Sequence, residues 1–267
     1  MSQTIPLFVS IPHSGERVPE LTPWLKNLSE EILMSDVDRY VDILYKSSLN
    51  ELQIPYQLTE WHRYAVDLNR IPSDIDQDSV IGAAQSAGVH SDGYHWVMTK
   101  NEVRLMPQPM GAETHQKLTQ LIYEPFHAGI RNHYNSFKNL GFKNIFQLDV
   151  HSMPSVGTRL HKDPGQMRAD IVVSDCLGKS CHPRFRDLVI AAYAVAGFKV
   201  SYNWPYMGGR VTEHYGRPES GQQVLQIELN RALYLDEKTK HILPGQQLIQ
   251  KKILKALTYI KSELPRV

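Results

Sequence analysis

The sequence of 267 residues lacks several features that mark specialised classes of protein. Its two cysteines, Cys176 and Cys181, are too few for a disulfide framework, which favours a reducing, cytoplasmic location. No apolar run approaches the roughly 18 residues of a membrane span, and no basic region precedes the short apolar run near the N-terminus, so we expect no signal peptide. Repeats, low-complexity tracts and linker composition are also missing, and we therefore expect a single domain over residues 1–267.

An excess of charge of one sign is missing as well. Lys and Arg number 29 against 28 Asp and Glu, and the formal net charge is +1. Proteins that bind nucleic acid usually carry a clear basic excess or a basic run, so we expect neither nucleic acid nor a membrane as a partner. No Gly-x-Ser-x-Gly motif follows an apolar run, which argues against a serine hydrolase. These features make no prediction of the oligomeric state.

Short apolar runs bounded by turn residues predict buried strands at residues 7–12, 64–68, 144–150, 171–174, 199–202 and 224–229. Helical periodicity predicts helices at residues 38–52, 113–140, 184–195 and 246–264, the second of them broken or bent at Pro125. This alternation favours an α/β fold with a parallel or mixed sheet and helices on both faces. Gly, Pro and polar residues predict long loops at residues 72–103, 153–169 and 204–222.

Polar side chains gather where the predicted strands end. His13 follows the first strand, Asn69 and Arg70 follow the second, and His151 follows the third, while Glu228 lies within the last. In open α/β sheets, ligands bind at the carboxyl ends of the strands. We therefore expect these side chains to belong to a functional site.

His13 and His151 are candidate metal ligands. Two imidazoles and one carboxylate, with a fourth position left to water, form a standard ligand set for hydrolytic zinc. The acidic pair at the start of the first predicted helix offers the carboxylate, with Asp38 as the ligand and Asp36 as a helix N-cap or a neighbour of the ligands. Glu16 is the alternative, because His13 and Glu16 have the spacing His-x-x-Glu.

Two further residues suit amide hydrolysis of an acidic substrate. A carboxylate in a buried strand needs a partner or a task, and Glu228 is the candidate general base and acid, the alternative being an ion pair with Arg231. Arg70 is the candidate anchor for a substrate carboxylate, because guanidinium binds carboxylate through two parallel hydrogen bonds. Its alternative is a structural salt bridge with Asp67 or Asp74.

Six short stretches, in order from residue 8 to about 237, resemble the N-formylglutamate amidohydrolase (N-formylglutamate deformylase) family. They are IPHSG at 11–15, DVD at 36–38, RYAVDLNR at 63–70, DVHSM at 149–153, GGRVT with HYG at 208–216, and QIELNRALY at 226–234. Each stretch alone is a weak signal, but six in the same order are a specific one. The resemblance covers most of the chain.

The family is similar in turn to zinc carboxypeptidases and aspartoacylase-type deacylases. The resemblance implies a three-layer α/β/α sandwich around a mixed, mostly parallel sheet. It also implies a divalent metal, zinc, held by His13, His151 and an acidic third ligand, with Glu228 as general base and acid. Asn69 and Arg70 resemble the pair with which carboxypeptidases hold a terminal carboxylate. The implied reaction is hydrolysis of an N-formyl or other N-acyl bond on a small carboxylate substrate such as N-formyl-L-glutamate.

Loop residues complete the predicted site. Arg168, Arg210 and His214 are candidates for contacting the substrate or the developing oxyanion, and the pair Gly208–Gly209 would let the backbone approach closely. A metallo-carboxypeptidase, another amidase, or a binding protein that kept only the fold are the alternative functions. A binding protein has no need of two metal-ligating histidines together with a buried glutamate, which favours an enzyme.

Overall fold

The computed structural model describes residues 4–266, which form two compact units. The first unit contains the chain up to Ile11, Tyr40–Gln57 and all residues from Ile130 on. The second unit contains Pro12–Arg39 and Leu58–Gly129. Each unit is described by itself, and the single domain expected from the sequence stays a prediction.

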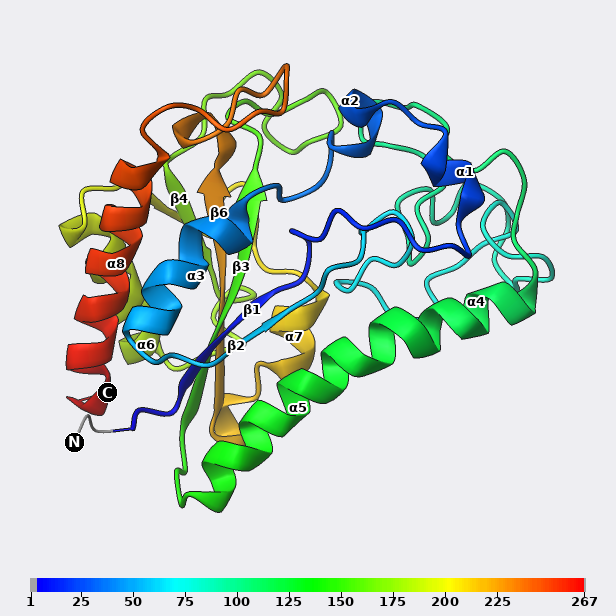
Figure 1. Ribbon diagram of the computed structural model, residues 1–267. Coiled ribbons are helices and arrows are strands. Elements are labelled where there is room, and N and C mark those ends of the chain that lie inside the picture. Colours follow the sequence, from blue (N-terminus) through cyan, green and yellow to red (C-terminus); the bar gives the residue numbers. More distant parts are fainter. Residues whose placement is uncertain (1–3, 267) are drawn as a thin grey trace. The chain divides into compact units, whose positions relative to one another are not determined.

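The first unit is built on a six-stranded sheet with the order β2-β1-β3-β6-β4-β5 (Figure 1). The strands are β1 (Leu7–Ile11), β2 (Tyr56–Leu58), β3 (Ile145–Met153), β4 (Ile171–Ser174), β5 (Val200–Tyr202) and β6 (Gln222–Asn230). β1, β3 and β6 run parallel, whereas β4 runs antiparallel to β6 and parallel to β5. The predicted α/β fold with a mixed, mostly parallel sheet is confirmed.

Helices cover both faces of this sheet (Figure 1). One face carries α3 (Val41–Glu51), α6 (Pro183–Val195) and α8 (Gln246–Glu263); the other carries α7 (Arg210–Tyr215) and the part of α5 (Glu124–Asn139) from Ile130 on. Aromatic contacts fix both layers: Phe146 of β3 packs on Phe185 of α6, and Phe8 of β1 packs on Tyr134 of α5. The three layers agree with the sandwich that the resemblance implied.

The two faces of the central strands differ in polarity. Because side chains alternate along a strand, the register places Leu7, Val9, Leu148, Val150, Leu225 and Ile227 on the face of α3, α6 and α8. Ser10, Gln147, Asp149, His151, Gln226 and Glu228 occupy the opposite face and are also buried. Buried polar groups are costly unless they are hydrogen-bonded, so this polar face must form a connected network.

The second unit consists mainly of loops and short helices. Its helices are α1 (Pro23–Lys26), α2 (Glu30–Leu33) and α4 (Ala112–Leu118), and α4 continues through a π-helical turn, Thr119–Tyr123, into α5. The turn precedes Pro125, whose ring clashes with a regular helix and which has no N–H to donate, so the irregularity lies close to the predicted bend. Residues 72–103 contain isolated bridges but neither helix nor strand, as predicted.

Two expectations about local structure were wrong, and three short elements were not expected. Residues 64–68 form turns and not a strand: Asp67 accepts a hydrogen bond from the backbone of Asn69, and Arg70 N–H donates to the Asp67 carbonyl. The predicted loop at 204–222 contains α7 and a short 3₁₀ helix, Pro218–Ser220. The sequence also gave no sign of β2, α1 or α2, which are three or four residues long and too short for a periodic pattern.

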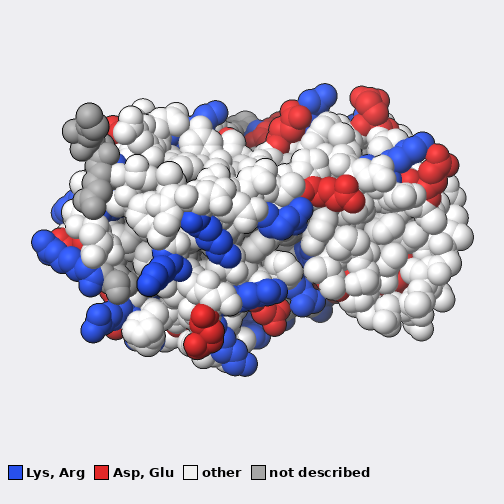
Figure 2. Space-filling model, turned by 90° about the horizontal axis from the view of Figure 1, so that it is seen from below, with Lys and Arg blue, Asp and Glu red and all other residues white. Residues whose placement is uncertain are grey.

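The surface mixes both signs of charge. On the face shown in Figure 2, Lys and Arg side chains occur together with Asp and Glu among uncharged residues. Across residues 4–266, no helix combines the length and the apolar character that crossing a membrane would require.

Candidate metal centre

In the second unit, His13 lies two residues beyond β1 and is buried. Its Nε2 lies 2.8 Å from Oδ1 of Asp67, and its Nδ1 lies 3.5 Å from Oδ2 of Asp38. An ionised carboxylate only accepts hydrogen bonds, so Nε2 of His13 carries the hydrogen and donates a hydrogen bond to Asp67. Nδ1 then presents its lone pair toward the side of Asp38.

Asp67 is fully buried and saturated with donors. Besides His13, its carboxylate accepts hydrogen bonds from Asn69 N–H at 2.9 Å, Arg63 at 2.8 Å and Trp96 Nε1 at 2.8 Å. Burial raises the pKa of Asp67, but its electrostatic interactions with His13 and Arg63 and the hydrogen bond from His13 more than offset that effect and hold the pKa well below its usual range. Asp67 is therefore an anion, which orients the imidazole of His13.

In the first unit, β3 presents His151 with a carboxylate of its own. Nε2 of His151 lies 2.9 Å from Oδ2 of Asp149, two residues earlier on the same face of the strand. Oδ1 of Asp149 accepts a hydrogen bond of 2.6 Å from the hydroxyl of Ser10 on β1. The same argument assigns the proton of His151 to Nε2 and its lone pair to Nδ1. An imidazole that binds a metal through one nitrogen usually donates a hydrogen bond from its other ring N–H, often to a carboxylate as here.

Glu228 on β6 is paired in register with His151 on β3. Its Oε1 accepts a hydrogen bond of 2.7 Å from the side-chain amide of Gln226. The oxygen of that amide accepts from the backbone N–H of Gly209, which can only donate, so the NH₂ group must face Glu228. Gln226 thus donates to Glu228 and orients its carboxyl group. The predicted alternative, an ion pair between Glu228 and Arg231, stays a prediction.

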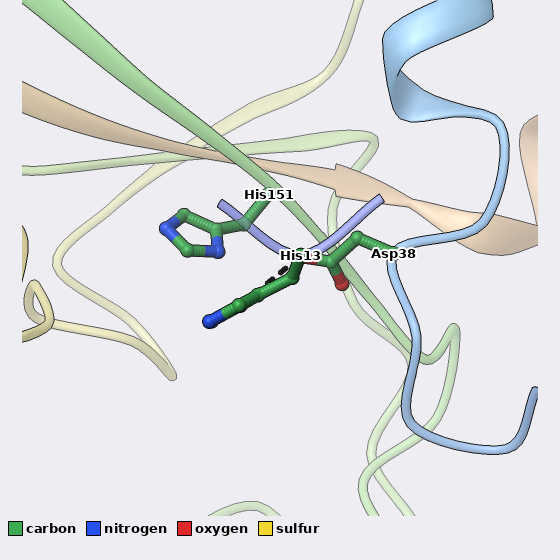
Figure 3. Close-up of side chains that lie close together, drawn as sticks. All are labelled: His13, Asp38 and His151. Carbon is green, nitrogen blue, oxygen red and sulfur yellow. Dashed lines mark ion pairs between the residues drawn. The ribbon is translucent and has the colours of Figure 1, made fainter. Parts of the chain in front are cut away.

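Ligand atoms of His13, Asp38 and His151 all lie within 4.8 Å of one another, and all three residues are buried (Figure 3). In a tetrahedral site with bonds of about 2.0–2.1 Å, neighbouring ligand atoms are roughly 3.3 Å apart. The 3.5 Å between Nδ1 of His13 and Oδ2 of Asp38 matches that spacing. Two imidazole nitrogens and a carboxylate, each imidazole fixed by a second carboxylate, fit a divalent metal of the zinc type.

The other acidic candidates have different partners. Asp36 accepts hydrogen bonds from the Tyr64 hydroxyl at 2.7 Å and from the backbone of Lys100, and it does not cap α3, whose N-cap is Tyr40. Glu16 is partly exposed, and its carboxylate accepts a hydrogen bond of 2.9 Å from Arg39. The geometry therefore favours Asp38 over both as the third ligand.

Asn69 and Arg70 belong to the same loop as Asp67. The side chain of Arg70 is one-third exposed; it donates to the carbonyls of Asn69 at 3.0 Å and Asp92 at 3.2 Å, and lies 3.7 Å from the Asp92 carboxylate. Its ion-pair partner is thus Asp92, and not Asp67 or Asp74 as the structural alternative supposed. Asp92 also pairs with Lys100. The role of Asn69 and Arg70 in binding a substrate stays a prediction.

The remaining candidates, Arg168, Arg210 and His214, differ in their burial and in their contacts. Arg168 is buried and donates two hydrogen bonds to the Asp163 carboxylate, at 2.7 and 2.8 Å, which favours a structural role. Arg210 is exposed and lies 3.4 Å from Glu213. His214 is also exposed on α7, and its partial burial together with the charge of nearby arginines lowers its pKa. Substrate contacts by these three residues stay predictions.

The sequence assigned no role to Asp149 or Gln226 and suggested Asp67 only as an alternative partner of Arg70, although all three residues contact a predicted site residue. A signal existed on the strands, where polar residues recur at every second position of otherwise apolar runs: Gln147, Asp149 and His151 on β3, and Gln226 and Glu228 on β6. No comparable periodicity marks Asp67, because it lies in a turn.

Comparison with known proteins agrees with the resemblance. The model of the N-formylglutamate amidohydrolase family matches residues 5–235, which include parts of both units. N-formylglutamate deformylase of Pseudomonas aeruginosa is 29% identical over 238 residues, covering 88% of this chain and 84% of the relative. The deformylase of Pseudomonas putida is 26% identical over 263 residues, covering 95% and 92%. The crystal structure of N-formylglutamate amidohydrolase from Ralstonia eutropha JMP134 superposes with a TM-score of 0.86 at 26% identity, covering 99% and 96%. The chain therefore belongs to the N-formylglutamate amidohydrolase family.

Proposed function

We propose that this protein hydrolyses the amide bond of N-formyl-L-glutamate to formate and glutamate, using a zinc ion held by His13, Asp38 and His151. The observation that carries the proposal is the buried group of two carboxylate-backed imidazoles and one carboxylate, whose ligand atoms lie within 4.8 Å of one another. Family membership and the relatives named N-formylglutamate deformylase support the choice of substrate.

Each protein group has a distinct task in this reaction. Zinc, when bound, supplies a Lewis acid for the formyl carbonyl and for water. Glu228, oriented by Gln226, accepts a proton from the attacking water while the water oxygen bonds to the formyl carbon. Glu228 then donates that proton to the amino nitrogen as the carbon–nitrogen bond breaks. Formate and the free amino acid are the products, and no further reactant is needed.

Arg70 and Asn69 anchor a carboxylate of the substrate in this proposal. The guanidinium of Arg70 is one-third exposed and lies 3.7 Å from the carboxylate of Asp92, a distance too long for a hydrogen bond. A substrate carboxylate could therefore replace that contact with a closer, bidentate one. This anchor would make an acidic N-formyl amino acid a better substrate than its amide.

The proposal is tested by metal analysis together with a screen for formate release. Protein purified without chelator is expected to contain about one zinc ion per chain, and to release formate from N-formylglutamate faster than from N-formylglutamine. Peptides with a free carboxyl terminus, the substrates of carboxypeptidases, are expected to remain intact. Protein that contains no divalent metal and is fully active in excess chelator would refute the metal centre. Peptide cleavage without formate release would refute the substrate.

Glu228→Gln tests the general base separately from the metal. The amide keeps the shape of the side chain but cannot accept the proton of water, so kcat should fall by about 10²–10⁴ while zinc content is unchanged. Glu219→Gln, an exposed residue that follows α7, is the control and should have wild-type activity. If Glu228→Gln loses its zinc, Glu228 is a ligand; if it retains wild-type kcat, another group is the base.

A further inference from the structure

Three buried side chains behind Asp149 take no part in the reaction proposed above. The hydroxyl of Ser10 donates to Oδ1 of Asp149 at 2.6 Å, and Nε2 of Gln147 donates to the Ser10 oxygen at 2.8 Å. The phenol of Tyr134, on α5, donates to Oε1 of Gln147 at 2.7 Å. All four residues are at most 3% exposed. The result is a continuous chain of hydrogen bonds across two strands and a helix of the first unit.

The donors in this chain all point the same way. Asp149 can only accept, so the single hydroxyl hydrogen of Ser10 is committed to it, and Ser10 must in turn accept from Gln147. The NH₂ group of Gln147 therefore faces Ser10, and its oxygen faces Tyr134. Burial raises the pKa of Tyr134 well above its usual range, so this residue is a neutral phenol and a donor. Every polar atom in the chain has a consistent role.

His151 donates to Asp149 from the other side, through Nε2. The described partners of the Asp149 carboxylate are thus the Ser10 hydroxyl and an imidazole, with no lysine or arginine among them. A buried anion without a cation depends strongly on each neutral donor that reaches it. Loss of the Ser10 donor should therefore weaken the hold of Asp149 on His151.

We infer that Ser10, supported by Gln147 and Tyr134, is a positioning residue for His151. Its hydrogen bond fixes the position of the Asp149 carboxylate, which accepts the N–H of His151 at Nε2 and so leaves the lone pair of Nδ1 directed to the metal. The inference rests on the metal centre proposed above and extends it beyond the ligands. It assigns a role to residues on β1, β3 and α5 that touch neither metal nor substrate.

The test is the dissociation constant of zinc, measured on metal-free protein by competition with a chromophoric chelator. Ser10→Ala should bind zinc about tenfold more weakly, at the lower end of the 10–100-fold effect of such outer partners. Ser180→Ala is the matched control: Ser180 is equally buried, but its hydroxyl donates to the backbone carbonyl of Val224. The control should bind zinc as the wild type does. Ser10→Thr, which restores a hydroxyl, should recover most of the affinity.

A double mutant separates positioning from packing. If Ser10 acts through Asp149, Ser10→Ala should add little to the loss of zinc affinity already caused by Asp149→Asn. Wild-type affinity in folded Ser10→Ala, or fully additive losses in the double mutant, would overturn the inference. Nitrogen NMR of the imidazoles in metal-free protein gives an independent result, because it reads the tautomer of His151. If wild-type protein binds no zinc, the proposed function fails; if the tautomer is unaffected by Ser10→Ala, the positioning role fails.

Discussion

Each of the two units contains a histidine that lies against a buried carboxylate, but the two carboxylates are stabilised differently. In the second unit Asp67 lies in a loop and binds the cation Arg63, the indole of Trp96 and a backbone N–H. In the first unit Asp149 lies on a strand, and its donor besides His151 is a hydroxyl backed by an amide and a phenol.

The difference follows from the backbones. Neighbouring strands align side chains at every second residue, so β1 and β3 place Ser10 opposite Asp149 without an ion pair between them. A loop has no such repeat, and its side chains must be fixed by individually strong contacts. Asp67 and Arg63, four residues apart, supply a charge-assisted hydrogen bond of 2.8 Å. In the sheet, strand register positions the carboxylate that binds His151. In the loop, an ion pair with Arg63 positions the carboxylate that binds His13.

Replacing each of the two carboxylates by an amide should affect stability to different extents. Asp67→Asn removes the anion beside Arg63 and leaves a largely buried cation, which should lower the free energy of unfolding by about 3–5 kcal/mol. Asp149→Asn removes an anion with no lysine or arginine among its partners in residues 4–266, so its cost should be smaller, about 1–2 kcal/mol. Urea unfolding of both metal-free variants measures the difference. Equal losses would show that charge does not distinguish the two carboxylates.

The second prediction concerns acid stability, and it singles out the second unit. His62 is buried; its Nε2 bonds the carbonyl of Leu33 and its Nδ1 accepts from Tyr64 N–H, so the neutral ring is the one that fits. Burial lowers the pKa of His62 to about 4, from an ordinary value of 6.5. Between these values the unfolded chain binds the proton and the folded chain does not. Stability is therefore complete above pH 6.5 and is lost as pH falls toward 4, by about 3 kcal/mol.

The measurement is the free energy of unfolding between pH 4 and pH 7 for wild type and His62→Gln. The variant is expected to be less stable at pH 7, because it loses the fitted ring, but its stability should depend less on pH. His95 adds to the slope in both proteins, since burial lowers its pKa to about 3. Parallel curves for wild type and variant would contradict the prediction that His62 is protonated on unfolding.

The sequence predicted the first unit better than the second, for the same physical reason. Buried strands leave apolar runs, so all strands except the three-residue β2 were found. Even so, β3 was expected to end at 150 and continues to Met153, because His151 and Ser152 interrupt the apolar pattern while the backbone ladder with β6 continues. The polar residues of the candidate site therefore prevent the end of β3 from being predicted from the apolar pattern.

In the second unit, an apolar run led to a wrong prediction of a strand. Residues 64–68 are apolar because Tyr64, Ala65, Val66 and Leu68 are buried, and burial alone does not require a strand. His13 and Asp38 could be proposed as ligands from residue type and position. The contact of His13 with Asp67 could not, because the two residues are 54 positions apart and a loop has no register from which pairing follows.

Two arginines, one in each unit, differ in the same way in how they are held. Arg70, in the second unit, donates hydrogen bonds to two carbonyls, and its guanidinium lies 3.7 Å from the nearest carboxylate oxygen, on Asp92. Arg168, in the first unit, is buried and donates two hydrogen bonds to the carboxylate of Asp163. If Arg70 anchors the substrate, Arg70→Lys keeps the charge but loses the fork. Because the site is partly exposed, the cost should be about 2 kcal/mol, roughly thirtyfold in kcat/KM for N-formylglutamate, and much less for N-formylglutamine. Arg168→Lys is the matched control: it should lower the melting temperature and affect both substrates equally. The opposite result would be a selective loss of kcat/KM for N-formylglutamate in Arg168→Lys but not in Arg70→Lys. It would show that Arg168, and not Arg70, binds the substrate carboxylate.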